Sequence, residues 1–188
     1  MTSSPNLSLP AAFPFVLRDG RPLRVGPVTP AARPVIEKAI ARLTPETSRR
    51  RFFTVRYRLS ERELDDLTQL DGVQRYAVGA TVADPAGGVE GVGVARFVRV
   101  ADSPAAAEVA VLVVDAFQGQ GVGRMLLARL MEAGVARGIA RFRGLVLPDN
   151  NPMLGLLRKC APGLAIIRGN GHLDVDVRLV AGSGAATA

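Results

Sequence analysis

The sequence predicts an α/β (α+β) fold, with a mixed and mostly antiparallel sheet flanked by helices. Apolar runs with strand character recur along the chain, and turn residues separate them. These runs lie at 76–82, 89–100, 107–114, 142–147, 164–167 and 172–180. Helical patterns occur early at 31–43, centrally at 125–137 and late at 153–159, after Asn151-Pro152. The central helix is interpreted as a crossover between two strands.

The first elements have local start signals. Asp19-Gly20 is typical of a two-residue hairpin turn between the apolar segments on either side of it. Thr29, followed by Pro30, predicts the N-cap and the first turn of the helix at 31–43.

The next two helices are marked in the same way. Residues 44–53 begin with Thr-Pro-Glu-Thr, which predicts a second, short helix, and Phe52 and Phe53 near its end are interpreted as core anchors. Ser60 and Glu63 predict a capping box for a third helix, whose leucines face inward.

Length and composition favour a single domain. The chain has 188 residues, of which 48% are hydrophobic, which is enough for a sizeable core. We expect a flexible tail over 1–14, one domain over 15–180 and a flexible end over 181–188. No apolar run approaches the roughly 20 residues that span a bilayer, and no secretory signal is seen. We therefore expect a cytoplasmic protein with no membrane partner.

Cysteine and histidine are scarce. The one cysteine, Cys160, excludes an internal disulfide, suits a reducing compartment and is interpreted as a packing residue. The one histidine, His172, is interpreted as a surface or structural residue near a turn. With one of each, no metal site is expected. Asp115 is interpreted as a turn-forming residue rather than a catalytic one.

The net charge of +7 comes almost entirely from arginine, since lysine occurs only at Lys38 and Lys159. A basic surface attracts anions such as coenzyme A, nucleic acid or acidic protein faces. The same arginine usage is equally consistent with genome composition. The densest cluster, at 49–51, lacks the spaced aromatic residues of a single-strand stacking platform, so nucleic acid is not an expected partner.

The most informative segment is the glycine-rich stretch 118–124, Gln-Gly-Gln-Gly-Val-Gly-Arg, between an apolar strand and a helix. Glycines let the backbone approach a phosphate closely, and the N–H groups of a helix N-terminus favour negative charge. The lysine of a P-loop is absent, and the last glycine of a dinucleotide fingerprint would fall on Arg124 or Leu126. Arg124 opposes the helix dipole, unless a bound polyanion reverses the sign of that interaction.

The spacing Gln-x-x-Gly-x-Gly resembles the coenzyme-A loop of the GNAT superfamily of N-acetyltransferases. The order of elements over residues 15–180 resembles the GNAT fold as well. The resemblance implies that loop amides hold the pyrophosphate of the co-substrate acetyl-CoA, without a metal. The residues assigned to acetyl-CoA are Leu112, Val113, Val114, Gln118, Gly119, Gln120, Gly121, Val122, Gly123, Arg124, Asn150 and Met153.

Asn150 and Met153 belong to a segment that looks like the part of the family after its fifth strand, where an asparagine contacts the coenzyme-A arm. Many members place a tyrosine seven residues after this asparagine, to protonate the leaving thiolate. Here Leu157 occupies that position. This departure implies that the thiolate leaves unassisted or is protonated by water.

Residues 44–53, from Thr-Pro-Glu-Thr to Arg-Phe-Phe, resemble a segment of bacterial protein lysine acetyltransferases. Members of that group modify acyl-CoA synthetases, and they often carry regulatory or synthetase-like domains that these 188 residues do not contain. The resemblance implies a protein lysine as the favoured acceptor, with a small-molecule amine close behind. The acceptor, the acyl preference and the oligomeric state stay open, with a homodimer as one option.

Acetyl transfer requires an uncharged amine, and a lysine with a pKa of about 10.4 is almost entirely protonated at pH 7. The candidate general base is Glu108, which follows a predicted loop at 101–105 and shares one strand face with Ala110 and Leu112. A carboxylate that enters an apolar sheet has its charged form disfavoured, which raises its pKa. Glu108 also resembles the catalytic glutamate in the Ala-Glu-Val segment of the protein lysine acetyltransferases. The alternative is a solvated glutamate at a strand end.

Three classes of function remain. The favoured one is direct transfer of an acetyl group from acetyl-CoA to an amine. The second is a non-catalytic acyl-CoA-binding or regulatory module, which would keep the loop but need no base. The third is a nucleic-acid-binding protein that uses the arginines and would bind with a steep salt dependence.

Overall fold

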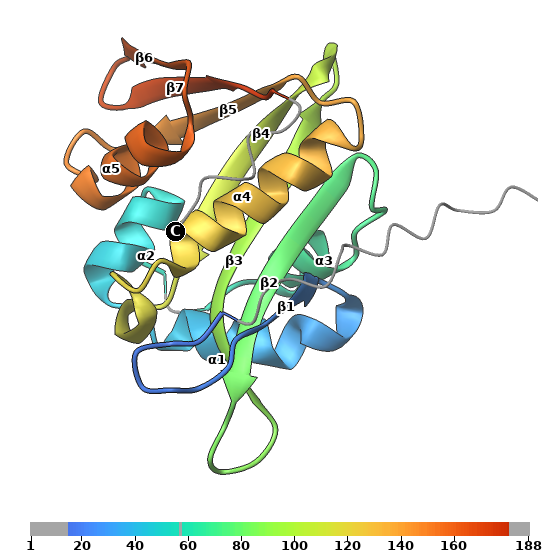
Figure 1. Cartoon of the computed structure of the whole chain (residues 1–188), viewed down its shortest axis with the longest axis vertical. Helices are drawn as coiled ribbons and strands as arrows, with labels where there is room; N and C mark the ends of the chain where they lie inside the picture. The colour runs from blue at the N-terminus through green and yellow to red at the C-terminus, as the bar shows by residue number, and fades with distance from the viewer. Residues whose placement is uncertain (1–14, 57, 181–188) are drawn as a thin grey trace, which may run out of the picture.

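A seven-stranded sheet in the order β1-β2-β3-β4-β5-β7-β6 forms the centre of the structure, a computed structural model that describes residues 15–56 and 58–180 (Figure 1). The strands are β1 Arg24–Pro27, β2 Arg75–Ala83, β3 Val89–Val100, β4 Ser103–Val113, β5 Arg141–Val146, β6 Leu164–Arg168 and β7 Leu173–Arg178. All neighbouring strands are antiparallel except β4 and β5, which are parallel. The predicted mixed, mostly antiparallel sheet is confirmed. The predicted tails at 1–14 and 181–188 lie outside the described residues.

Helices cover both faces of the sheet. Figure 1 shows α4 across the front of the sheet and α1 and α3 behind it, and α4 is the crossover between the parallel strands β4 and β5. Within the described ranges, no helix has the length and apolarity that a bilayer crossing requires. The helices are α1 Arg33–Ala41, α2 Pro45–Phe52, α3 Glu61–Thr68, α4 Val122–Val135 and α5 Asn151–Cys160, with 3-10 turns η1 Pro30–Ala32 and η2 Asp115–Phe117.

Of the two predicted helix caps, the capping box is present and the other lacks its side-chain hydrogen bond. Ser60 and Glu63 form the predicted capping box at α3, with N–H···O distances of 2.9 and 3.3 Å. Thr29 and Pro30 begin the first turn as predicted, but the Thr29 side chain makes no capping hydrogen bond, and this turn is the 3-10 turn η1, after which α1 begins at Arg33. Pro34 explains the later start of α1, since it lacks the N–H that a helix beginning at residue 31 would need there. At α2, Thr44 Oγ1 accepts the Thr47 N–H at 3.2 Å.

Two boundaries near the centre of the sheet differ from the prediction. β4 begins at Ser103, so the predicted loop over 101–105 is wrong for its last three residues, which continue as strand beside β3. α4 begins at Val122, three residues earlier than predicted, because Gly121 adopts a left-handed conformation with φ 87° and acts as the N-cap.

The predicted N-terminal hairpin is confirmed only in its turn. Gly20 has φ 83°, as a tight turn allows, but the flanking segments pair only between Val16 and Pro22. The following strand, β1, pairs with β2 instead. The longer β2 offers more backbone partners, so the hairpin contributes a turn rather than a two-stranded ribbon.

The central aromatic core holds α4 against the sheet. Phe97 lies between Tyr76 and Phe142, with ring centroids 5.8 and 5.9 Å away, and both phenylalanine rings are fully buried. Gly134 of α4 faces the Phe142 ring so closely that any side chain there would meet it. The glycine therefore sets how near α4 lies to β5, and with it the position of the loop that precedes α4.

We expect Gly134→Ala to destabilise the fold by about 1–3 kcal/mol, because the added Cβ would lie 2.8 Å from Cζ of Phe142 and 3.2 Å from Cδ1 of Leu179. Gly155→Ala in α5 is the matched control. Its Cβ would meet no atom within 4 Å, and helix propensity favours alanine by up to about 1 kcal/mol. Denaturant unfolding measures both variants. Wild-type stability in Gly134→Ala would contradict this close packing.

Candidate functional site

The parallel strands β4 and β5 pair over only three rows, and a cavity opens where they separate. The paired rows join 106–108 of β4 to 141–143 of β5. Beyond them β4 stays with β3 and β5 stays with β7. The resulting cavity has a volume of about 980 Å³ and runs along β4 from the glycine-rich loop to Glu108.

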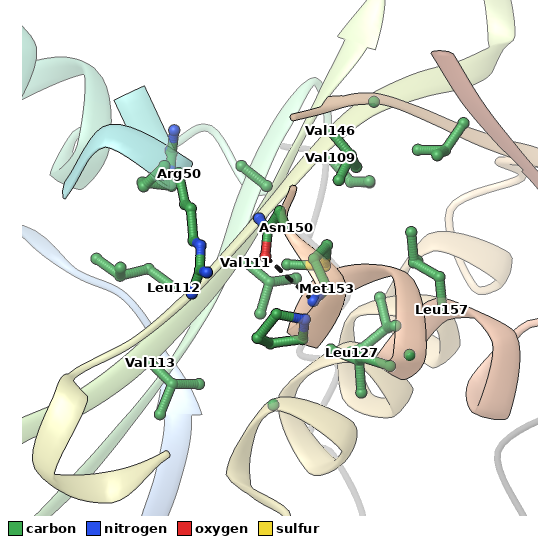
Figure 2. Close-up of a pocket in the computed structure, with 18 of the residues that line it drawn as sticks. Arg50, Val109, Val111, Leu112, Val113, Leu127, Val146, Asn150, Met153 and Leu157 are labelled. Carbon is green, nitrogen blue, oxygen red and sulfur yellow. Dashed lines mark hydrogen bonds between the residues drawn. The ribbon is translucent and has the colours of Figure 1, made fainter. Parts of the chain in front are cut away.

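The cavity passes through the sheet rather than lying on one face. Figure 2 shows Leu112 of β4 and Arg50 of α2 on one side of the strand. On the other side lie Val111 of β4 and Met153 of α5. A ligand in this cavity can therefore reach groups from both faces. One end lies at the start of α4, and the other opens toward α2.

The glycine-rich loop has the backbone geometry of an anion site. Gly119 and Gly121 have φ of 70° and 87°, a region that other residues rarely adopt. The first N–H of α4 with a partner inside the helix is that of Met125, which donates to the Gly121 carbonyl at 3.0 Å. The preceding N–H groups, at 122–124, belong to the first turn and cannot be paired within the helix. They provide donors and a positive dipole end for an anion.

Hydrogen bonds of its own glutamines and of Arg18 hold this loop in place. Gln118 Nε2 donates to the Val113 carbonyl at 3.0 Å and to Thr47 Oγ1 at 3.2 Å. The Gly119 carbonyl and Gln120 Oε1 accept hydrogen bonds from Arg18, at 2.8 and 3.0 Å. The two glutamines assigned to the co-substrate thus have polar groups engaged within the protein, which fix the shape of the loop.

Asp115 connects the loop region to the start of α2. It accepts hydrogen bonds from the Thr44 N–H at 3.0 Å, the Thr44 hydroxyl at 2.7 Å and the Thr47 hydroxyl at 2.6 Å. Burial acts to raise the pKa of Asp115, but the hydrogen bonds from Thr47 and Thr44 outweigh it, so the pKa lies below its ordinary value. Asp115 is in the predicted turn, and the structure adds a role as a clamp between β4 and α2.

The α5 wall combines a cap with an apolar surface. Asn150 is buried, and its Oδ1 accepts the Met153 N–H at 3.2 Å, which makes it the N-cap of α5. Both residues line the cavity, as does Leu157, which is buried. None of the described residues in the cavity wall is a tyrosine.

Most residues assigned to acetyl-CoA lie in this wall, and three do not. Val114 and Val122 are buried in the hydrophobic core, and Gln120 lies outside the cavity lining. The residues that line the cavity are Leu112, Val113, Gln118, Gly119, Gly121, Gly123, Arg124, Asn150 and Met153. Val114 follows the last residue of β4 and Val122 begins α4, and both side chains pack into the core. The Gln120 side chain instead bonds to the Arg18 N–H and to the Ala116 carbonyl.

The loop end of the cavity carries positive charge. Arg124 and Lys159 line it, together with the partly buried Cys160. Burial raises the pKa of the Cys160 thiol, and the charges of Arg124 and Lys159 partly offset that effect. His172 lies away from this cavity, 3.5 Å from Asp174. Among residues 15–56 and 58–180, no three metal-binding side chains gather into a site.

Glu108 lies at the last paired row of β4 and β5 and lines the cavity. The predicted burial of this carboxylate is wrong, because the side chain is exposed. It shares its strand face with Ala110 and Leu112, as predicted, but this part of the face borders the open cavity instead of a packed core.

The sequence did not indicate the α2 side of the site. Phe53 was expected in the core, but it is 46% exposed and lines the cavity, because the left-handed backbone at φ 61° ends α2 and turns the residue outward. Arg50, Arg51 and Arg96 line the same region. The dense arginine run at 49–51 was the available signal, but its proximity to β3 depends on tertiary packing.

We expect Asp115→Asn to lower the free energy of unfolding at pH 7 by about 1–3 kcal/mol, the cost of losing hydrogen bonds to a charged group. The pKa of this carboxyl is lowered in the folded state, so its contribution is complete above the unfolded pKa of about 3.9 and disappears as pH falls through the folded value. The deficit should therefore shrink below about pH 4. Asp102→Asn, in an exposed turn, is the control. Unfolding curves from pH 3 to 7 would contradict the clamp if the two variants were equally stable.

Comparison with known proteins identifies the family. A model described as the acetyltransferase (GNAT) family matches residues 46–161. Acetyltransferase Pat of Mycolicibacterium smegmatis (strain ATCC 700084 / mc(2)155) is 31% identical over 148 residues, which are 75% of this chain and 41% of that protein.

Solved structures agree with this match. The GNAT domain of S. lividans PAT has a TM-score of 0.78 and 33% identity, and the match covers 89% of this chain and 96% of that one. A cAMP-binding acyltransferase from Mycobacterium smegmatis has a TM-score of 0.60 and 27% identity, covering 89% of this chain and 47% of that one. The chain thus spans less than half the length of this acyltransferase and of Pat. With the family model matching more than half of its residues, the chain belongs to the acetyltransferase (GNAT) family.

Proposed function

We propose that this chain is an N-acetyltransferase that moves an acetyl group from acetyl-CoA directly to an amine, with a protein lysine as the favoured acceptor. The observation that supports this most is that one cavity has an anion cradle at one end and Glu108 at the other. The similarity to acetyltransferase Pat and to the GNAT domain of PAT supports the same activity.

The loop end suits the pyrophosphate of acetyl-CoA. The N–H groups at 122–124 offer donors, and Arg124 and Lys159 add positive charge beside them. From there the pantetheine arm would follow β4, whose edge is unpaired beyond Glu108 on the β5 side. Backbone N–H and C=O groups on that edge match the amides of the arm. The thioester would then lie near Glu108.

The reaction removes two protons from the ammonium nitrogen and one leaving group from the thioester carbon. Glu108, directly or through a water, takes the proton from the ammonium so that the neutral nitrogen attacks the thioester carbonyl carbon. The C–S bond then breaks, the coenzyme-A thiolate leaves, and the nitrogen releases its second proton to water to give the neutral amide. Leu157 offers no proton, so water protonates the thiolate in this scheme.

The proposal is tested by incubating the protein with acetyl-CoA and a panel of lysine-bearing proteins, peptides and small amines. Release of free thiol and mass spectrometry of the acceptors identify the reaction. Acetylation of lysines in proteins supports the proposal. Transfer to small amines alone would favour the alternative acceptor class. Tight acetyl-CoA binding with no transfer at all would favour a regulatory binding module.

We expect Gly121→Asp to weaken acetyl-CoA binding by roughly tenfold or more, about 1.4 kcal/mol per decade, because it adds a negative charge at the anion cradle. Gly87→Asp is a matched control. It also replaces a glycine of positive φ, but in the β2–β3 turn, where the added Cβ would meet no atom within 4 Å; at residue 121 it would meet the Phe15 ring only at ordinary van der Waals distance. Calorimetry measures both affinities. Equal affinities in the two folded variants would remove acetyl-CoA from this loop.

We expect Glu108→Gln to keep acetyl-CoA affinity within a few-fold of wild type and to lower turnover at pH 7 by roughly 10²-fold or more, the size of a general-base effect. The deficit should shrink above about pH 9, where more lysine amine is already neutral. Glu37→Gln, an exposed position on α1, is the control. A pH profile of turnover for the three proteins decides the role. Wild-type turnover in Glu108→Gln at pH 7 would exclude it.

A further inference from the structure

Two arginines near Glu108 have no protein partner that explains them. Arg51 at the end of α2 and Arg96 on β3, here called the arginine pair, line both the main cavity and a second hollow of about 300 Å³. Among the described residues, neither makes an ion pair or a side-chain hydrogen bond. The Arg51 guanidinium does make a cation–π contact with the Phe52 ring, at 5.0 Å from the ring centroid.

The carboxylates of the second hollow do not neutralise the pair. The second hollow contains two carboxylates, and each forms an ion pair with an arginine outside the pair. Glu63 is paired with Arg56. Asp66 is paired with Arg75 at 2.9 Å. Four arginines therefore share two carboxylates in this region, and the arginine pair accounts for the excess positive charge. Such a cluster costs free energy unless an anion joins it.

The electrostatics of the pair show this cost. Burial, together with the nearby positive charge of Arg96, lowers the pKa of Arg51 to about 10. Burial also lowers the pKa of Arg96, with Arg75 adding to the effect and Asp66 opposing it. An anion between two guanidinium groups would stabilise their charged forms and could accept several N–H donors at once.

The register of the sheet relates the pair to the general base. Arg96 lies opposite Ala110 on β4, and Val98 lies opposite Glu108. Arg96 and Glu108 are therefore diagonal neighbours on one face, a separation of about 7–8 Å between Cα atoms. The distance from an anion at the pair to an amine at Glu108 is therefore short enough for one small amino acid to span. A lysine and its neighbouring residue in a polypeptide can also span it.

The position of the second hollow favours the acceptor over the acyl donor as the source of the anion. Its lining comes from α2, α3, β2, β3 and the segment before α3, with no residue from β4, β5 or the glycine-rich loop. The acetyl group itself carries no charge. Phe53, exposed beside the pair, offers an apolar surface for the methylene chain of an amine.

We propose that the arginine pair binds a carboxylate of the acceptor, so that the protein selects amines with a carboxylate close by. This proposal rests on the acetyltransferase function proposed above and names the chemistry of its acceptor. The carboxylate has two sources, an acidic side chain next to a lysine in a polypeptide or the carboxylate of a free amino acid.

The test measures kcat and KM with acetyl-CoA for matched acceptors. Lysine peptides with aspartate at neighbouring positions are compared with the same peptides carrying asparagine, and free lysine is compared with its decarboxylated diamine. Arg51→Gln and Arg96→Gln should raise KM for the carboxylate-bearing acceptors roughly tenfold or more, the effect of losing a charge-assisted contact, with KM for acetyl-CoA within about twofold. Arg96→Lys should restore part of the loss. Arg24→Gln, an equal charge change on exposed β1, should have no effect.

The outcomes separate the proposals. A preference for aspartate peptides, or for free lysine, that the two glutamine variants abolish supports the carboxylate site and identifies its source. Equal use of acidic and neutral acceptors by the wild type would overturn the site while leaving the acetyltransferase function intact. A selective loss of succinyl-CoA use in the variants would assign the pair to the acyl group instead. No transfer to any acceptor would reject both proposals.

Discussion

The short parallel contact between β4 and β5 is the constraint on which the site depends. β4 keeps its pairing with β3, and β5 keeps its pairing with β7, so the two strands share only three rows before the sheet divides. Backbone groups left unpaired inside a protein need other partners. The open edge of β4 is therefore both a wall of the cavity and a row of donors and acceptors for an extended ligand. Because α4 is the crossover between these strands, its N-terminus necessarily lies beside the cavity.

A network around Asp115 joins three elements at the loop end of the site. The carboxylate accepts from Thr44 and Thr47, and Thr47 Oγ1 accepts from Gln118, so α2, the end of β4 and the glycine-rich loop are joined through adjacent hydrogen bonds. The second contact of Gln118, to Val113, closes the loop onto its own strand. A loop rich in glycine has high conformational entropy when free. These side chains fix it in one shape, so less ordering is left for a bound anion to impose.

Local chemistry made much of the fold predictable, and non-local packing explains the failures. The Ser60–Glu63 capping box and the loop at 118–124 depend on residues within a few positions of each other, and both appear as expected. The exposure of Glu108 depends on the strands separating beside it, which no local pattern encodes. Phe53 was misassigned for a similar reason, since a left-handed residue at the end of α2 reverses the direction in which an aromatic side chain points. The neighbours of Arg96 come from other elements, so its charge could be read from the sequence but its position beside Arg51 could not be predicted.

The basic composition acquires a specific meaning once the charges are located. Many arginines are neutralised in surface pairs, such as Arg33 with Asp65 and Arg141 with Asp176. Such pairs contribute little and reveal no ligand. Positive charge is left at the two ends of the cavity. Arg124 and Lys159 carry it at the loop end, and the arginine pair carries it at the other end, where the carboxylate of Glu108 also lies. In the proposed reaction the loop end meets a pyrophosphate and the arginine pair meets a carboxylate, while the ammonium meets Glu108 beside the pair. Net charge alone therefore could not distinguish an effect of genome composition from ligand binding. Among the described residues, Arg51 and Arg96 form no ion pair with a carboxylate, and this points to an anion from outside the chain.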